Sequence, residues 1–131
     1  MNPADHLSPG LLAIEVHTVE PEHTAAHLGS GTVKVLSTPS MILFMEIAAR
    51  KLLDEHLPEG YSSVGVHVDV YHRAPAWVGT EVSASAEIER IEDNRVILAV
   101  RVTQGLTIIG EGQHERFIID VQRFLKRSAG E

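Results

Sequence analysis

The amino-acid sequence predicts an α+β domain in which one long helix packs against one antiparallel sheet. Two observations support this fold class. Residues 37–57, STPSMILFMEIAARKLLDEHL, form a strongly apolar segment that opens with Ser-Thr-Pro and is followed by Pro-Glu-Gly, which are signals for the start and the end of a helix. Residues 62–74 and 78–91 alternate in character from one position to the next, as strands do when one face is buried.

The other elements follow in order along the chain. Residues 11–19 (LLAIEVHTV) predict a first strand, residues 20–31 a loop rich in Pro, His and Gly, and residues 32–36 a short extended piece. After the helix, four segments predict strands: 62–74, 78–91, 95–104 and 106–124. One strand, one long helix and four strands with short connections is the order of the hotdog fold, in which a curved sheet cradles the helix.

Composition narrows the class of protein. The chain has 131 residues, of which 44% are hydrophobic, so it can bury a core as one domain over 1–131. It has no cysteine, which excludes disulfides and thiolate chemistry. A net charge of −7 disfavours nucleic acid and anionic lipid as partners. We expect no secretion signal, because the segment MNPADHLSPGLL has no basic stretch followed by an apolar core, and the apolar run 41–49 is too short to cross a bilayer. We therefore expect a cytoplasmic protein without membrane partners.

Glu46 interrupts the apolar run of the helix. At about 100° per residue, the side of the helix that carries Glu46 also carries leucines, and the whole helix is apolar nearly all round, which predicts that other structure wraps it. Glu46 has two readings. It pairs with Arg50 one turn later, or it is a carboxylate partly withdrawn from water, where catalytic acids and bases are found.

The strand predicted at 62–74 contains two unusual residues. Its even positions form a valine row that ends in His72, and alternation places this row on the core side. His72 is either an inert strand-end histidine or a general base that titrates near neutral pH. Gly65 lies inside the strand, where glycine marks a bulge, a packing adjustment or a close approach of a ligand.

Three further features each have a structural and a functional reading. Thr38 is a helix cap, or its hydroxyl lies where the positive end of the helix favours an oxyanion. Arg116, in the segment GQHER, is a solvated strand charge or a group that binds a phosphate or carboxylate. His23 and His27 are spaced for one helix face, but no third ligand is evident, so the sequence predicts no metal site.

Three motifs together resemble the fluoroacetyl-CoA thioesterase-like family of hotdog proteins: GSGTVKVLSTPSMILFMEIAAR, GVHVDVYH and GQHER. The similarity runs over about the whole chain. The resemblance implies that Thr38, Glu46 and His72 are catalytic and that Gly65 and Arg116 bind substrate. It also implies hydrolysis of an acyl-CoA thioester, without a cofactor, by a homodimer that exists alone or as a dimer of dimers. Glu46 would attack the thioester directly or activate water.

One departure from this family concerns the segment before the helix. The residues AHLGSGTVKVL contain no aromatic side chain, whereas the fluoroacetyl-specific enzyme that the chain resembles has a longer, aromatic-containing lid. We therefore expect a short-chain acyl-CoA thioesterase without strong selectivity for the fluorinated group. Two alternatives are a non-catalytic acyl-CoA-binding hotdog module, which would not need Glu46 or His72, and a histidine-based metal-binding domain.

Overall fold

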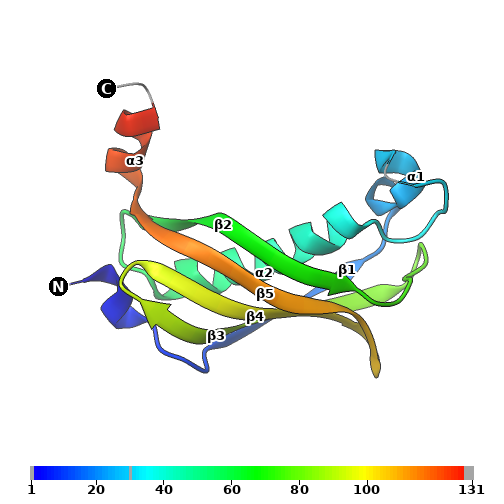
Figure 1. The fold of residues 1–131 in the computed structure, drawn as a ribbon, viewed down its shortest axis with the longest axis horizontal. Helices are drawn as coiled ribbons and strands as arrows, with labels where there is room; N and C mark the ends of the chain where they lie inside the picture. Colours follow the sequence, from blue (N-terminus) through cyan, green and yellow to red (C-terminus); the bar gives the residue numbers. More distant parts are fainter. Residues whose placement is uncertain (1, 30, 129–131) are drawn as a thin grey trace.

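The computed structural model describes residues 2–29 and 31–128, and it consists of one sheet with one long helix across a face (Figure 1). The sheet has five strands in the order β1-β3-β4-β5-β2, and each neighbouring pair is antiparallel. The strands are β1 (Leu12–Thr18), β2 (Tyr61–His72), β3 (Glu81–Glu92), β4 (Arg95–Gln104) and β5 (Thr107–Asp120), and the long helix is α2 (Thr38–His56). This arrangement confirms the predicted α+β class.

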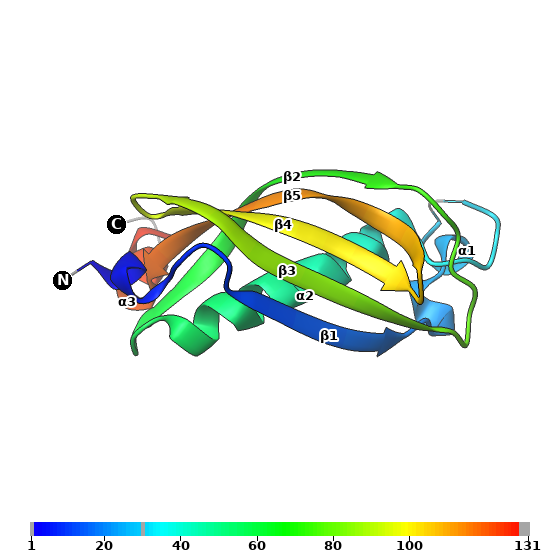
Figure 2. The same ribbon diagram turned by 90° about the horizontal axis from the view of Figure 1, so that it is seen from below.

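The curved sheet wraps around α2 on one side, as the view from below shows (Figure 2). Eight residues of α2 are buried, all but Ser40 apolar: Ser40, Met41, Phe44, Met45, Ala48, Ala49, Leu52 and Leu53. The predicted wrapping of the helix by a curved sheet is confirmed, but it is not complete, because Leu43 is 48% exposed. β1 and β2 are the two edges of the sheet, and the exposure of Leu43 shows that the sheet leaves part of the helix surface open to solvent.

Two segments differ from their predicted structure. Residues 20–31 contain a short 3₁₀ turn (Pro21–His23) and the one-turn helix α1 (Ala25–Leu28) inside the predicted loop; Ser30 lies outside the described residues. The last predicted strand ends at Asp120, and α3 (Val121–Ser128) follows. Asp120 pairs with the first residue of β2, so residues beyond it have no strand partner. The Asp120 carboxylate accepts the Arg123 backbone N–H instead, as a helix cap does.

The Thr38 hydroxyl does not cap the start of α2. Ser37, not Thr38, is the N-cap, and its Oγ accepts the backbone N–H of Ser40 at 3.1 Å. Thr38 and Pro39 are the first two helical residues, where proline is favoured because its missing N–H has no intrahelical partner to lose. The capping interpretation of Thr38 is therefore wrong, and its hydroxyl can bond elsewhere.

A β-bulge divides β2 into two halves. The register with β5 shifts between Gly65 and His67, so Val66 is the extra residue. Because paired residues point to the same side of a sheet, Val68, which pairs with the buried His114, faces the helix side, whereas Val64, which pairs with the exposed Phe117, faces outward. The predicted valine row is thus correct only after the bulge, and the bulge that Gly65 suggested is confirmed.

The core fills the space between α2 and the central strands, with β4 contributing the apolar side chains Val96, Leu98, Val100 and Val102. No helix among the described residues is long and apolar enough to span a bilayer.

We predict that Leu98→Ala lowers the free energy of unfolding by about 2–5 kcal/mol, because Leu98 is fully buried and alanine leaves a cavity. Urea denaturation measures this change. Leu106→Ala is the matched control, because that leucine is fully exposed, and surface substitutions change stability by about 0.5 kcal/mol or less. Equal effects of the two substitutions would contradict the placement of the core.

Candidate active site between α2, β2 and β5

Thr38 and His72 form the first polar pair of the site. The Thr38 Oγ1 lies 2.8 Å from the His72 Nδ1, across 34 positions of sequence. Burial lowers the pKa of His72, so the ring is held neutral and can exchange a proton with the hydroxyl. The other ring nitrogen, Nε2, is buried and has no hydrogen-bond partner among the described residues. The structure thus brings together two of the residues that the sequence selected.

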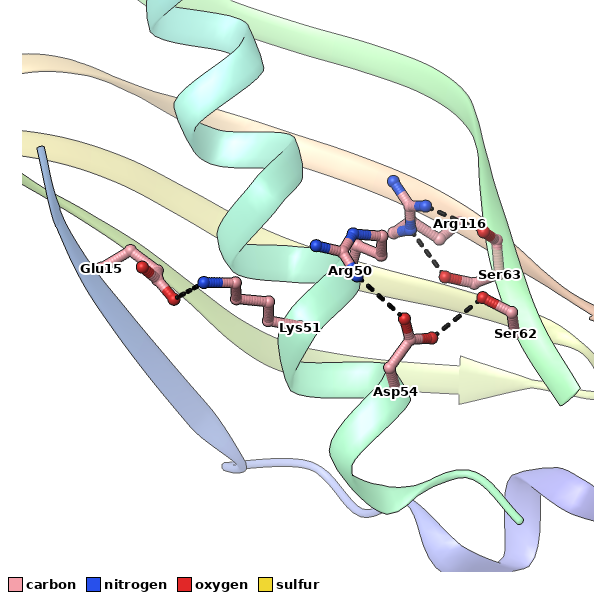
Figure 3. Close-up of polar contacts among 7 residues, drawn as sticks. All are labelled: Glu15, Arg50, Lys51, Asp54, Ser62, Ser63 and Arg116. Atoms are coloured by element: carbon pink, nitrogen blue, oxygen red, sulfur yellow. Dashed lines mark hydrogen bonds and ion pairs between the residues drawn. The ribbon is translucent and has the colours of Figure 1, made fainter. Parts of the chain in front are cut away.

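Arg50 does not pair with Glu46. Its Nη1 lies 3.1 Å from Asp54, and the Asp54 carboxylate also accepts the Ser62 hydroxyl at 2.9 Å (Figure 3). The Glu46 carboxylate instead lies on the side of Arg116, with 3.8 Å between Oε2 and Nη1. The ion-pair interpretation of Glu46 through Arg50 is therefore wrong, and the carboxylate has a cation of β5 beside it.

Arg116 is 5% exposed and its guanidinium is fixed to β2. Its Nε donates to the Ser63 hydroxyl at 2.8 Å, and its Nη2 donates to the Ser63 carbonyl at 2.9 Å (Figure 3). Burial lowers the pKa of Arg116, and the neighbouring Glu46 opposes that shift. The interpretation of Arg116 as a solvated strand charge is wrong. It is a buried cation that faces the carboxylate of α2.

Because Gly65 has no side chain, it leaves room for the Glu46 carboxylate. It pairs with Arg116 across the two strands. A Cβ atom at Gly65 would lie 2.8 Å from the Glu46 Oε2 and 3.1 Å from the His114 Cε1, distances that real Cβ atoms rarely or never show. Glycine at this position therefore follows from close approach of the helix carboxylate to the strand backbone.

His114 completes this second group, although the sequence did not single it out as a site residue. His114 is 1% exposed, and its Nδ1 lies 2.9 Å from the His67 carbonyl in the β2 bulge. Its Nε2 lies 3.2 Å from the Arg116 Nη1 and 4.0 Å from the Glu46 Oε2. The spacing of two between His114 and Arg116 was the available signal, because it places both side chains on one face of the strand.

The five predicted residues therefore form two groups along one helix face. Thr38 and Glu46 are eight positions apart, about 12 Å along the axis and within about 80° around it. A hydrogen-bonded hydroxyl and imidazole lie at the start of the helix, and a carboxylate beside a buried guanidinium lies two turns later. Together they provide a nucleophile or base, a neutral proton carrier and a fixed cation.

His23, one of the two histidines weighed as metal ligands, lies elsewhere. The centroid of its ring lies 4.9 Å from that of Phe44, with the two rings nearly perpendicular, while His17 stacks on Phe44 with 4.2 Å between the ring centroids. Over residues 2–29 and 31–128, no three His, Asp or Glu side chains are grouped as a metal site requires. His17 and His23 therefore pack against a side chain of α2.

Comparisons with known proteins agree on one family. A sequence model of the family described as fluoroacetyl-CoA-specific thioesterase matches residues 19–122. The fluoroacetyl-CoA thioesterase of Streptantibioticus cattleyicolor is 30% identical over 112 residues, which are 81% of each chain. A variant of the fluoroacetyl-CoA-specific thioesterase, solved with fluoroacetate and CoA, superimposes with a TM-score of 0.84 at 28% identity, over 90% of this chain and 99% of that one. A hot-dog-like protein from Thermanaerovibrio acidaminovorans gives a TM-score of 0.88 at 28% identity, over 98% and 95%.

The buried histidines predict how stability depends on pH. Burial is the largest cause that lowers the pKa of His17, His72 and His114, whereas the unfolded value is about 6.5. Below that value the unfolded chain binds protons that the folded chain excludes, so the free energy of unfolding falls as the pH falls from about 7.5 to 5.5. Urea midpoints across this range measure the effect, and His17→Gln reduces the slope. A flat profile would contradict the prediction.

Proposed function

Because the chain belongs to the fluoroacetyl-CoA-specific thioesterase family, we propose that it hydrolyses short-chain acyl-CoA thioesters to the free acid and CoA. The observation that carries the proposal is the Glu46 carboxylate, which interrupts the apolar run 41–49 of α2, is 40% exposed and lies 3.8 Å from a buried guanidinium. A carboxylate with these neighbours can attack a thioester carbonyl or remove a proton from water.

The proposed roles divide between the two groups. Glu46 is the nucleophile, which breaks the thioester C–S bond, releases CoA as its thiolate and gives an acyl-enzyme anhydride that water then hydrolyses to the free acid, or it is the base that activates water for direct attack with release of the same thiolate. His72 moves a proton, because its hydrogen bond at 2.8 Å links its ring to the Thr38 hydroxyl. Thr38, in the first turn of α2, stabilises the oxyanion of the tetrahedral intermediate together with the positive end of the helix. No metal or other cofactor takes part.

Gly65 and Arg116 bind the acyl end of the substrate in this proposal. Both lie beside Glu46: a Cβ on Gly65 would contact the Glu46 carboxylate, and the Arg116 Nη1 faces it. Arg116 is too buried to reach the phosphates of CoA in solvent. Its guanidinium is instead placed to attract a polar group of the bound acyl moiety or the charge that develops next to Glu46.

A homodimer, alone or as a dimer of dimers, is the proposed assembly. β2 is the last strand in the sheet order, so its outer edge is available for antiparallel pairing with a second copy. Val66 is 55% exposed, Val68 is 37% exposed, and Leu43 on the neighbouring helix face is 48% exposed. The predicted cytoplasmic location fits both the substrate class and the lack of cysteine.

The main alternative is a module that binds acyl-CoA without hydrolysing it. Such a module needs a cleft but neither the Glu46 carboxylate nor the bond between Thr38 and His72. The structure contains both features, and the family consists of hydrolases by its description, so hydrolysis is favoured. Release of free thiol across acyl-CoA chain lengths distinguishes the two, since a binding module releases none.

We predict that Glu46→Gln lowers kcat by about 10²–10⁴ while the protein stays folded, because glutamine keeps the shape and loses the charge and the basicity. Glu55→Gln is the matched control on the exposed side of the same helix and leaves kcat unchanged. Thiol release gives the rates and circular dichroism checks the fold. An unchanged kcat in folded Glu46→Gln would refute the role of this carboxylate.

We also predict that kcat/KM for fluoroacetyl-CoA exceeds that for acetyl-CoA by less than about 10³, because a pocket without a dedicated aromatic gate discriminates poorly between near-isosteric groups. Phe44 is 1% exposed and packed between His17 and His23. Trp77 lies beside the segment before α2, because it forms an isolated β-bridge with Val35. It belongs, however, to the connection between β2 and β3, and it is 56% exposed. Steady-state kinetics on the two thioesters measure the ratio. A much larger ratio would show that a side chain outside this segment acts as the gate.

A further inference from the structure

The β2 bulge determines which nitrogen of His114 carries the proton. The His67 carbonyl, 2.9 Å from the His114 Nδ1, can only accept a hydrogen bond, so Nδ1 is the protonated nitrogen of the neutral ring. The other nitrogen, Nε2, then has a free lone pair. Its neighbour at 3.2 Å is the Arg116 Nη1, which can only donate. The two contacts therefore require the same tautomer.

His114 is also the third point that fixes the Arg116 guanidinium. Nε and Nη2 are bound to the hydroxyl and the carbonyl of Ser63, and Nη1 is bound to His114. Nη1 is the guanidinium nitrogen 3.8 Å from the Glu46 Oε2. The nitrogen that faces the carboxylate is thus the one that His114 holds.

We propose that His114 is a positioning residue for the reaction, acting through Arg116: as the Nδ1–H tautomer set by the His67 carbonyl, it holds the Arg116 Nη1 against Glu46. The His114 Nε2 lies 4.0 Å from the Glu46 Oε2, beyond hydrogen-bond distance, so His114 acts through the guanidinium and not by direct proton transfer. This inference rests on the proposed function in so far as Glu46 takes part in hydrolysis. The geometry of the tautomer stands independently of it.

Two amide substitutions separate the two contacts of the ring. In His114→Asn, the amide nitrogen can occupy the position of Nδ1 and keep the bond to the His67 carbonyl, but no acceptor reaches Arg116. In His114→Gln, the amide oxygen can occupy the position of Nε2 and accept from Arg116. We expect kcat to fall by about 10²-fold in His114→Asn and by about tenfold or less in His114→Gln, with KM changed less than about threefold in both.

His56 provides the matched control. Its Nδ1 lies 2.9 Å from a backbone carbonyl, that of Leu52, in the last turn of α2, away from Glu46. His56→Asn and His56→Gln therefore remove a partly buried histidine with the same kind of bond, and we expect both to leave kcat and KM unchanged. Circular dichroism of all four variants establishes that each remains folded.

A double-mutant cycle tests whether His114 acts through Arg116. If it does, His114→Asn lowers kcat little further in an Arg116→Lys background, because lysine keeps the charge but lacks the planar fork that His114 orients. Nitrogen-15 NMR of the unmodified protein supplies a readout that needs neither activity nor a variant. We expect the signals of a ring protonated at Nδ1 and unprotonated at Nε2.

Three results would overturn the inference: equal losses of kcat in His114→Asn and His114→Gln, additive losses in the double variant, or an Nε2-protonated ring. If the unmodified protein hydrolyses no acyl-CoA thioester, the proposed function fails and so does the catalytic part of the inference. In that case the NMR measurement still decides which nitrogen of His114 carries the proton, and an Nε2-protonated ring would exclude acceptance of the Arg116 hydrogen bond.

Discussion

The buried guanidinium of Arg116 is the constraint on which the arrangement around Glu46 depends. A cation withdrawn from water is costly unless its donors are paired. Here Ser63 takes two of the donors and His114 takes a third. The contacts with Ser63 fix the register of β2 against β5 before the bulge, because Ser63 reaches Arg116 across the two strands, whereas His114 lies on β5 itself. The same contacts orient the Arg116 Nη1 toward α2, where it lies 3.8 Å from the Glu46 carboxylate.

The register explains why the bulge in β2 matters. Before the bulge, Ser63 and Gly65 face the helix side, and after it Val68 and His72 do so. In a regular strand, odd-numbered and even-numbered residues face opposite sides along the whole length. Gly65 and His72 could then not both have faced the helix. The extra residue therefore lets a single edge strand contribute to both polar groups, one at the first turn of α2 and one beside Glu46.

The sequence predicted the element order well because the helix and strand signals are local. The helix segment, the strand 95–104 and the choice of Thr38, Glu46, His72, Gly65 and Arg116 depend on residue type, spacing and resemblance. Most of the errors concern features set by distant contacts. Alternation along β2 failed at the bulge, and the last strand ended where its partner strand β2 begins, at Tyr61. The partner of Arg50 is a local error, because Glu46 and Asp54 both lie one helical turn from Arg50 and the sequence did not distinguish them. His114 was missed because its importance comes from a backbone carbonyl 47 positions away.

The position of Trp77 has a practical consequence for spectroscopy. It is the one tryptophan of the sequence, it is 56% exposed, and its backbone bridges Val35 just before α2 begins. Indole emission changes with the polarity around the ring, so the native protein carries a fluorophore at the segment that precedes the helix. A ligand that shifts this segment would alter the emission spectrum, and titrations could be followed optically on unlabelled protein, with an inactive Glu46→Gln variant keeping the substrate intact.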